Sequence, residues 1–344
     1  MTIDRNKSPR GSAVGLGSMP GTSAHESLGI ITDTVTDLVH VPELPARGPG
    51  GEMVGRTVGL LHRVDDGFSI ETTPSGWRIA RGENRIMRRA NSWLNEDIDE
   101  LEAVAHEHSG FLKMQIAGPW TLAASIEMIN GHRIINDFGA VQDYAQGISA
   151  AVSLFLKDAR RRFPHASWVI QIDEPWIGGV LRGEVPTRTG RGSLPPVDGQ
   201  TVQQLLTNIS ESIHTQDAVA WIHTCANQPP LELMVKAGFD GISVDMSQLR
   251  NGDEEFITDM WDKNVVLIAG LDTAHKGSQS NAARALLDPV VDLARKVSAP
   301  LDSLKNYLNI SPTCGLAFSA DPARELNTLV SAADILRELE EGSH

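Results

Sequence analysis

Short apolar runs rich in β-branched residues recur along the chain, and longer amphipathic stretches separate them. A short apolar run bounded by turn residues is typical of a buried strand, whereas apolar residues spaced three or four apart indicate a helix that buries one side. The pattern predicts seven strands: Ala13 to Gly17, Leu112 to Ile116, Trp168 to Ile172, Val219 to His223, Gly241 to Val244, Val265 to Ala269 and Tyr307 to Ile310.

The clearest helical pattern covers Ser23 to Val39, where Leu28, Ile31, Val35 and Leu38 fall on one face. Ser23 and Glu26 have the spacing of a capping box, which favours a helix start at this point. The Gly- and Pro-rich stretch from Gly183 to Gly199 is instead expected to form a long loop.

Alternation of strands and helices favours a parallel sheet, because parallel neighbours need a crossover connection. We therefore predict an α/β fold in which residues 1–344 form a single (β/α)8 barrel of the TIM type, with residues 1–10 disordered. The eighth strand is sought within Val54 to Arg81, although Phe68 to Ala80 fits a β-hairpin excursion better. An open doubly wound sheet is the alternative architecture.

Charge and composition exclude several classes of protein. Asp and Glu total 44 against 30 Lys and Arg, so the formal net charge is -14, and neither nucleic acid nor an anionic membrane is an expected partner. No apolar run approaches the ~20 residues of a membrane-spanning helix. The first ten residues lack the apolar core of a signal peptide, so a cytoplasmic location is expected. Two cysteines in a chain of this length argue against a disulfide scaffold.

Polar residues that follow the predicted strands have metal-binding chemistry. In a β/α barrel these positions build the active site, and here they include His223, Cys225, Asp245 and Cys314. Thiolates and imidazole are ligands that zinc prefers. Because the chain has no local Cys-x-x-Cys pair, such a site would be formed by the barrel and not by a zinc finger. The alternative is that both cysteines and the histidine are ordinary buried residues.

Six segments resemble the catalytic domain of cobalamin-independent methionine synthase, in the wider family that includes uroporphyrinogen decarboxylase. The segments occur in the family's order and span nearly the whole chain. They are Gly17-Ser18-Met19-Pro20-Gly21-Thr22, Gly118-Pro119-Trp120-Thr121, Gln171-Ile172-Asp173-Glu174-Pro175, His223-Thr224-Cys225, Ile242-Ser243-Val244-Asp245 and Cys314-Gly315-Leu316.

The resemblance implies a Zn²⁺ ion bound by His223, Cys225 and Cys314. A carboxylate would complete the set at Asp245, where the family usually has the longer glutamate. The chain departs from the family at Ala123-Ala124-Ser125, where relatives carry a tryptophan that can stack on folate.

The same resemblance implies roles in substrate binding. Ser18 would hold the carboxylate of homocysteine and Asp173 its ammonium group, with Glu43 as a candidate second carboxylate for that ammonium. His275 and Asp272 follow a predicted strand and are candidates for a general acid that protonates a departing group, although their spacing differs from the family's Asp-x-His.

These features predict a zinc-dependent methyltransferase that converts homocysteine to methionine, because zinc deprotonates a bound thiol and holds its sulfur in place. The methyl donor would be a folate, a methylated corrinoid protein or a small methyl compound, since the chain is too short for the extra N-terminal barrel of the folate-using enzymes. Two alternatives are a zinc-dependent methyltransferase acting on coenzyme M or another thiol, and a noncatalytic protein that binds zinc or a thiol. A uroporphyrinogen-type decarboxylase is disfavoured, because its chemistry requires neither cysteine.

Overall fold

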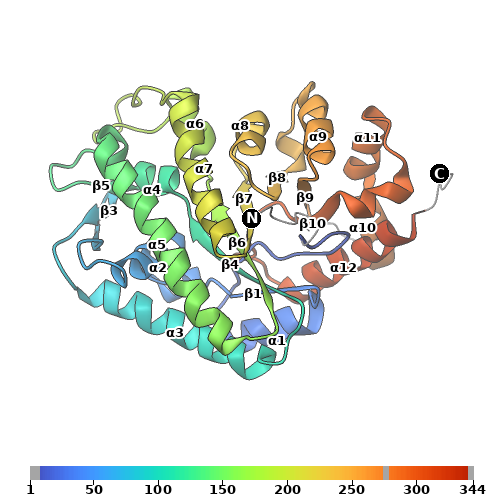
Figure 1. Ribbon diagram of the computed structural model, residues 1–344, viewed down its shortest axis with the longest axis horizontal. Helices are drawn as coiled ribbons and strands as arrows, with labels where there is room; N and C mark the ends of the chain where they lie inside the picture. The colour runs from blue at the N-terminus through green and yellow to red at the C-terminus, as the bar shows by residue number, and fades with distance from the viewer. Residues whose placement is uncertain (1–7, 274–278, 340–344) are drawn as a thin grey trace.

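A curled parallel sheet forms the centre of the protein in the computed structural model, which describes residues 8–273 and 279–339 (Figure 1). The strands follow the order β1-β4-β6-β7-β8-β9-β10, and every neighbouring pair is parallel. Their bounds are β1 (Leu38–His40), β4 (Phe111–Ala117), β6 (Ser167–Asp173), β7 (Val219–Thr224), β8 (Gly241–Asp245), β9 (Val266–Leu271) and β10 (Leu308–Pro312).

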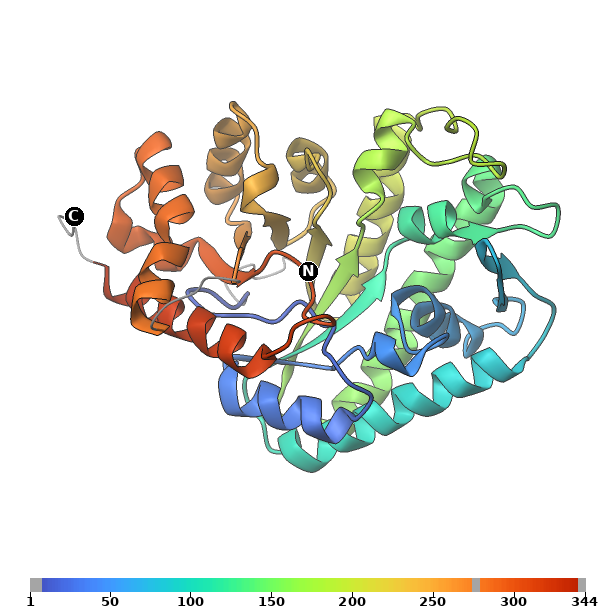
Figure 2. The same ribbon diagram turned by 180° about the vertical axis from the view of Figure 1, so that it is seen from behind.

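Helices pack around the outside of the curled sheet, as the two opposite views show (Figures 1 and 2). None of the helices in the described residues combines the length and apolarity needed to cross a membrane. The α-helices are α1 (Ala24–Thr34), α2 (Met53–His62), α3 (Arg85–Ala105), α4 (Pro119–Ser125), α5 (Phe138–Arg162), α6 (Ile177–Arg182), α7 (Gly199–Thr215), α8 (Leu231–Lys236), α9 (Asp253–Asp262), α10 (Gln279–Leu286), α11 (Asp288–Lys296) and α12 (Pro322–Glu338).

The strand order decides between the two architectures considered from the sequence. A doubly wound sheet reverses its order at a switch point, whereas the strands of a β/α barrel follow one another in chain order. Here each strand of the large sheet pairs with the next one along the chain. The sheet therefore has the order of a TIM-type barrel, with seven strands in place of the expected eight.

The segment 11–19 lies between the two edge strands β1 and β10 but is not a continuous strand. Ala13 forms an isolated parallel bridge with Ile310 of β10, and Ser18 forms another with Glu43, just beyond β1. The predicted strand from Ala13 to Gly17 is therefore reduced to these bridges.

Two expectations for the N-terminal third were wrong. The eighth barrel strand does not lie within Val54 to Arg81, because the two strands of that segment belong to a separate small sheet. The barrel strand that the sequence did not reveal is the short β1. The helix predicted to reach Val39 ends at Thr34, although Ser23 caps it as expected by accepting a hydrogen bond from Glu26 N. The segment 68–80 contributes β2 (Ile70–Thr73) and β3 (Gly76–Ile79), which pair antiparallel, and β3 also pairs with β5 (Ile126–Glu127).

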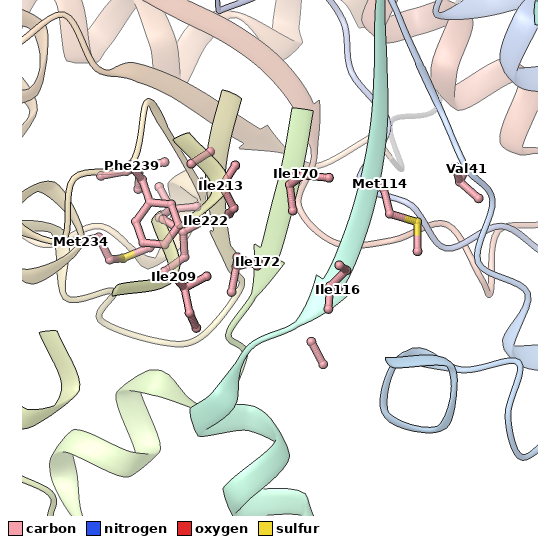
Figure 3. Packing of buried hydrophobic residues seen from close by; sticks show 14 of the residues in the cluster. Val41, Met114, Ile116, Ile170, Ile172, Ile209, Ile213, Ile222, Met234 and Phe239 are labelled. Atoms are coloured by element: carbon pink, nitrogen blue, oxygen red, sulfur yellow. The ribbon is translucent and has the colours of Figure 1, made fainter. Parts of the chain in front are cut away.

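Side chains of each strand alternate between the helices and the interior enclosed by the sheet. In β4, Leu112, Met114 and Ile116 belong to the large apolar core, while Lys113 and Gln115 occupy the alternate positions. Figure 3 shows this core, in which isoleucines of β6 and β7 pack with side chains of α7 and with Met234 and Phe239. Burial of such side chains stabilises the fold by about 1.5–3 kcal/mol each.

The interior changes from apolar to polar along the direction of the strands. A second, smaller cluster of buried side chains lines it first, made up of Val14, Leu38, Val169, Trp221 and Ile268. Two residues further along their strands, the same face carries His40, Gln171 and His223, all buried.

Trp221, a member of this smaller apolar cluster, contacts the first described residue: its indole Nε1 donates a hydrogen bond to Ser8 Oγ at 3.1 Å. The carbonyl oxygen of Pro9 accepts a hydrogen bond from Asn309 Nδ2 at 2.7 Å. Of the stretch expected to be disordered, residues 8–10 thus pack against β7 and β10, and residues 1–7 lie outside the described residues.

Gly17 permits a conformation that a larger residue would strain. Its φ is +140°, and a Cβ atom there would lie 2.4 Å from the side chain of Gln115. We predict that Gly17→Ala lowers the free energy of unfolding by about 2–4 kcal/mol, since backbone strain and overlap both contribute. Urea denaturation measures the change.

Gly21→Ala is the matched control, because Gly21 also has a positive φ, +80°, but a Cβ there meets nothing within 4 Å. Its cost should stay near the conformational value of about 1 kcal/mol. Equal losses in the two variants would contradict the overlap with Gln115.

Candidate active site

A pocket of about 190 Å³ opens at the C-terminal end of the strands. His223 near the end of β7, Cys225 just beyond it and Cys314 just beyond β10 share this pocket, although they lie far apart in the sequence. The other polar side chains that line it are Ser18, Glu43, Gln115, Gln171 and Asp173. We refer to it below as the site pocket.

The two cysteine sulfurs of the site pocket lie 3.9 Å apart. Two thiolates bound to one tetrahedral zinc ion at about 2.3 Å each would be about 3.8 Å apart. The hydrogen bond between the two sulfurs lowers the pKa of the Cys314 thiol to about 6 and raises the pKa of Cys225. The pair therefore favours one thiolate at Cys314 with the proton kept on Cys225.

His223 is presented to the same pocket as a neutral imidazole. Its ring is buried, and burial lowers its pKa to about 3. Nδ1 lies 3.0 Å from Ser243 Oγ, a contact that fixes the ring and leaves Nε2 available as a ligand. Within the described residues, no group of three or more His, Cys, Asp or Glu side chains is already gathered as closely as a bound metal requires.

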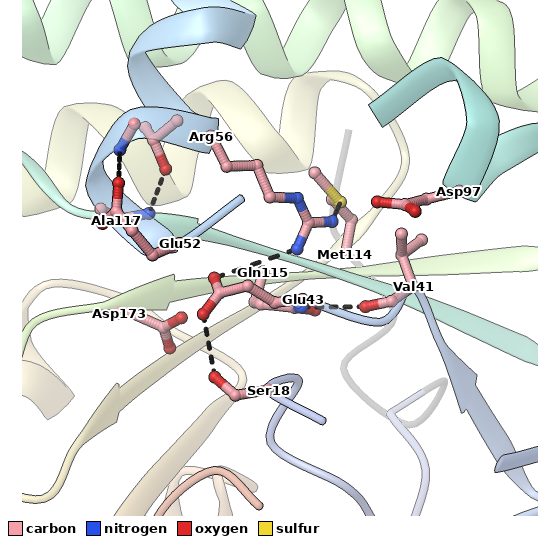
Figure 4. A network of polar contacts seen from close by, with 12 residues as sticks. Ser18, Val41, Glu43, Glu52, Arg56, Asp97, Met114, Gln115, Ala117 and Asp173 are labelled. Carbon is pink, nitrogen blue, oxygen red and sulfur yellow. Dashed lines mark hydrogen bonds and ion pairs between the residues drawn. The ribbon is translucent and has the colours of Figure 1, made fainter. Parts of the chain in front are cut away.

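Two buried carboxylates form another wall of the site pocket. Glu43 Oε1 accepts a hydrogen bond from Ser18 Oγ at 2.9 Å, and Glu43 Oε2 lies 3.9 Å from Arg56 Nη1 (Figure 4). Asp173 Oδ1 accepts a hydrogen bond from Gln171 Nε2 at 2.7 Å. Burial raises the pKa of both carboxyl groups. A bound cation beside them would lower these pKa values again.

Comparison with known proteins gives the family. The family model described as the catalytic domain of cobalamin-independent synthase matches residues 98–334. This chain belongs to that family. It is therefore a methyltransferase, and the resemblance drawn from the six sequence segments is confirmed.

Among solved structures, a B12-independent methionine synthase from Shewanella sp. W3-18-1, in complex with selenomethionine, is similar to this chain with a TM-score of 0.55. The two are 13% identical, and the match covers 96% of this chain and 98% of the other. A type I 3-dehydroquinate dehydratase from Clostridium difficile is more distant, at 10% identity, 72% and 89% coverage and a TM-score of 0.28. No curated protein sequence matches the chain.

Asp245, expected as a zinc ligand, and Asp272, expected as a catalytic residue, do not line the site pocket. Asp245 accepts a hydrogen bond from Ser247 N at 2.8 Å through Oδ1, and it lines a neighbouring pocket of about 360 Å³. Asp272 is exposed and lines that same neighbouring pocket. His275, the other candidate for a general acid, lies outside the described residues.

Sequence analysis missed Lys113 and Gln115 and gave Gln171 no role of its own. All three are buried side chains in or directly beneath the site pocket. The signal was present in β4, where Lys113 and Gln115 are two positions apart in an otherwise apolar strand and must therefore share a face.

The sulfur pair makes a testable prediction for metal-free protein. Alkylation of Cys314 by iodoacetamide should accelerate with rising pH around a midpoint near 6, because the thiolate is the reactive form. In Cys225→Ala, which removes the hydrogen-bonding group, the midpoint should move up toward the ordinary thiol range of about 8.5. Mass spectrometry of the labelled peptide measures both rates, and an unchanged midpoint in the variant would refute the sulfur hydrogen bond.

Proposed function

We propose that this methyltransferase transfers a methyl group to the thiol of homocysteine, forming methionine, with Zn²⁺ held by His223, Cys225 and Cys314. The observation that carries the proposal is that the 3.9 Å sulfur pair and two buried carboxylates line one small pocket. Such a pocket can receive a thiol at one end and an ammonium group at the other.

The donor set suits zinc. The separation of the two sulfurs matches that of two thiolates on one zinc ion, and His223 in the same pocket supplies the neutral imidazole that such a site also uses. Three protein ligands would leave a position for substrate. When bound, zinc would deprotonate a substrate thiol and keep its sulfur nucleophilic. Asp245 remains a candidate fourth ligand, and its Oδ1 would have to leave Ser247 N or share that contact.

The carboxylate wall argues for an amino-acid thiol. Asp173 and Glu43 provide acceptors for an ammonium group, while Ser18 at the same wall offers a hydroxyl that can turn toward the substrate carboxylate. A sulfonate thiol such as coenzyme M has no cationic group to match these acceptors. Held at both ends, the substrate would present its sulfur in a fixed direction, which supplies much of the rate in a displacement reaction.

A donor screen tests the activity. Purified protein with Zn²⁺ is given homocysteine and, in turn, methylcobalamin, a methylated corrinoid protein and methylated folates, and methionine is followed by mass spectrometry. We expect methionine from at least one donor, and a loss of both bound zinc and activity in Cys314→Ser. Tight binding of zinc and homocysteine without methionine from any donor would support the noncatalytic alternative.

The proposed contact between Asp173 and the ammonium group of homocysteine gives a separate prediction. Asp173→Asn should raise the KM for homocysteine about 10- to 100-fold, because a charged hydrogen bond is worth about 1.5–3 kcal/mol. Zinc content should not change, since Asp173 is not among the proposed ligands. The matched control is Asp259→Asn. Asp259 lies on α9 and forms a half-exposed ion pair with Lys263, so this substitution should leave the KM unaltered.

A further inference from the structure

Lys113 and Gln171 form a connected set of hydrogen bonds directly beneath the site pocket. Lys113 Nζ donates to Gln171 Oε1 at 2.8 Å. Gln171 Nε2 in turn donates to Asp173 Oδ1 at 2.7 Å, so Asp173 Oδ2 is the oxygen left for a ligand. The three side chains thus link the barrel interior to the wall of the pocket.

Lys113 fixes which way the amide of Gln171 points. An ammonium group can only donate hydrogen bonds, so the oxygen of the amide must face Lys113 and its nitrogen must face Asp173. Without the lysine, Gln171 Oε1 would lose this donor, and only the contacts of Nε2 with Asp173 and with the carbonyl oxygen of Leu16 would hold the amide.

The same two side chains also hold the segment that carries Ser18. Lys113 Nζ and Gln171 Nε2 both donate to the carbonyl oxygen of Leu16, at 2.9 and 3.0 Å. Ser18 follows two residues later and bonds to Glu43. Lys113 and Gln171 therefore support both Asp173 and the segment of Ser18, the two parts of the pocket proposed to bind the ammonium and carboxylate groups of the substrate.

Burying Lys113 and Gln171 away from water costs free energy. Lys113 is 0% exposed and Gln171 1%. Burial lowers the pKa of Lys113 to about 7, opposed by the charge of Asp173. Packing requires only a side chain of this volume, so packing alone does not explain a charged side chain at this position.

We propose that Lys113 and Gln171 are positioning residues that orient Asp173 and the Ser18 segment, and so make the site pocket select thiols with an α-amino group over thiols without one. The inference rests on the proposed function, because it assumes that the substrate amine lies at Asp173.

The experiment compares two thiols that differ only in the amino group, homocysteine and 4-sulfanylbutanoate. Binding of each to the full-length protein with Zn²⁺ is measured by calorimetry, so that the sulfur–metal contribution cancels in the ratio of dissociation constants. Wild type should prefer homocysteine by at least ~10-fold, the value of one charged hydrogen bond. In Lys113→Met and in Gln171→Met the preference should fall to within about threefold of unity.

The second variant keeps the test decisive if the first does not fold, since Gln171→Met breaks the same connection without removing a charge. Lys236→Met, in the half-exposed pair with Glu232 on α8, is the matched control and should keep the wild-type preference. If both site variants keep the preference, or weaken both thiols equally, the positioning role is overturned. If wild type itself shows no preference, the homocysteine proposal falls together with it.

Discussion

Charges buried inside the sheet must be neutralised by one another, and this constraint shapes the whole site. Lys113 and Arg56 lie beside Glu43 and Asp173, and each of these side chains is at least nine-tenths buried. Removing one member of such a group leaves an uncompensated charge, which costs about 3–5 kcal/mol. The strands must therefore bring all of them into place together.

The alternation of side chains along each strand meets that constraint. One face of each strand supplies the apolar core beneath the helices, and the other supplies the interior. Because the strands are parallel, their C-terminal ends share one rim, so polar residues late in each strand converge without any long-range sequence signal. His223 and Asp173, which are directly opposite each other in the β6–β7 register, illustrate this convergence.

Much of this arrangement could be predicted from the sequence. The strand positions of β4 and β6 to β10 follow from their apolar runs, and the meeting of Cys225 and Cys314 follows from the parallel order of those strands. The predictions that failed concerned short strands or local turns. Three-residue β1 was hidden because Leu38 continues the helical spacing of α1, and the Asp245 side chain is engaged by a turn whose geometry no residue pattern reveals. Lys113 escaped notice because a lysine inside a barrel is rare unless it is paired.

The apolar cluster that includes Trp221 fills the interior of the sheet below the polar layer, and Ser8 accepts a hydrogen bond from the Trp221 indole. Asp173 and Cys314 line one pocket at the opposite end of the strands, so a ligand that contacts Asp173 lies close to the sulfur pair. Under the proposed function, a substrate that enters the pocket from the rim carrying Cys225 and Cys314 would therefore place its amino-acid end deeper in the barrel than its sulfur.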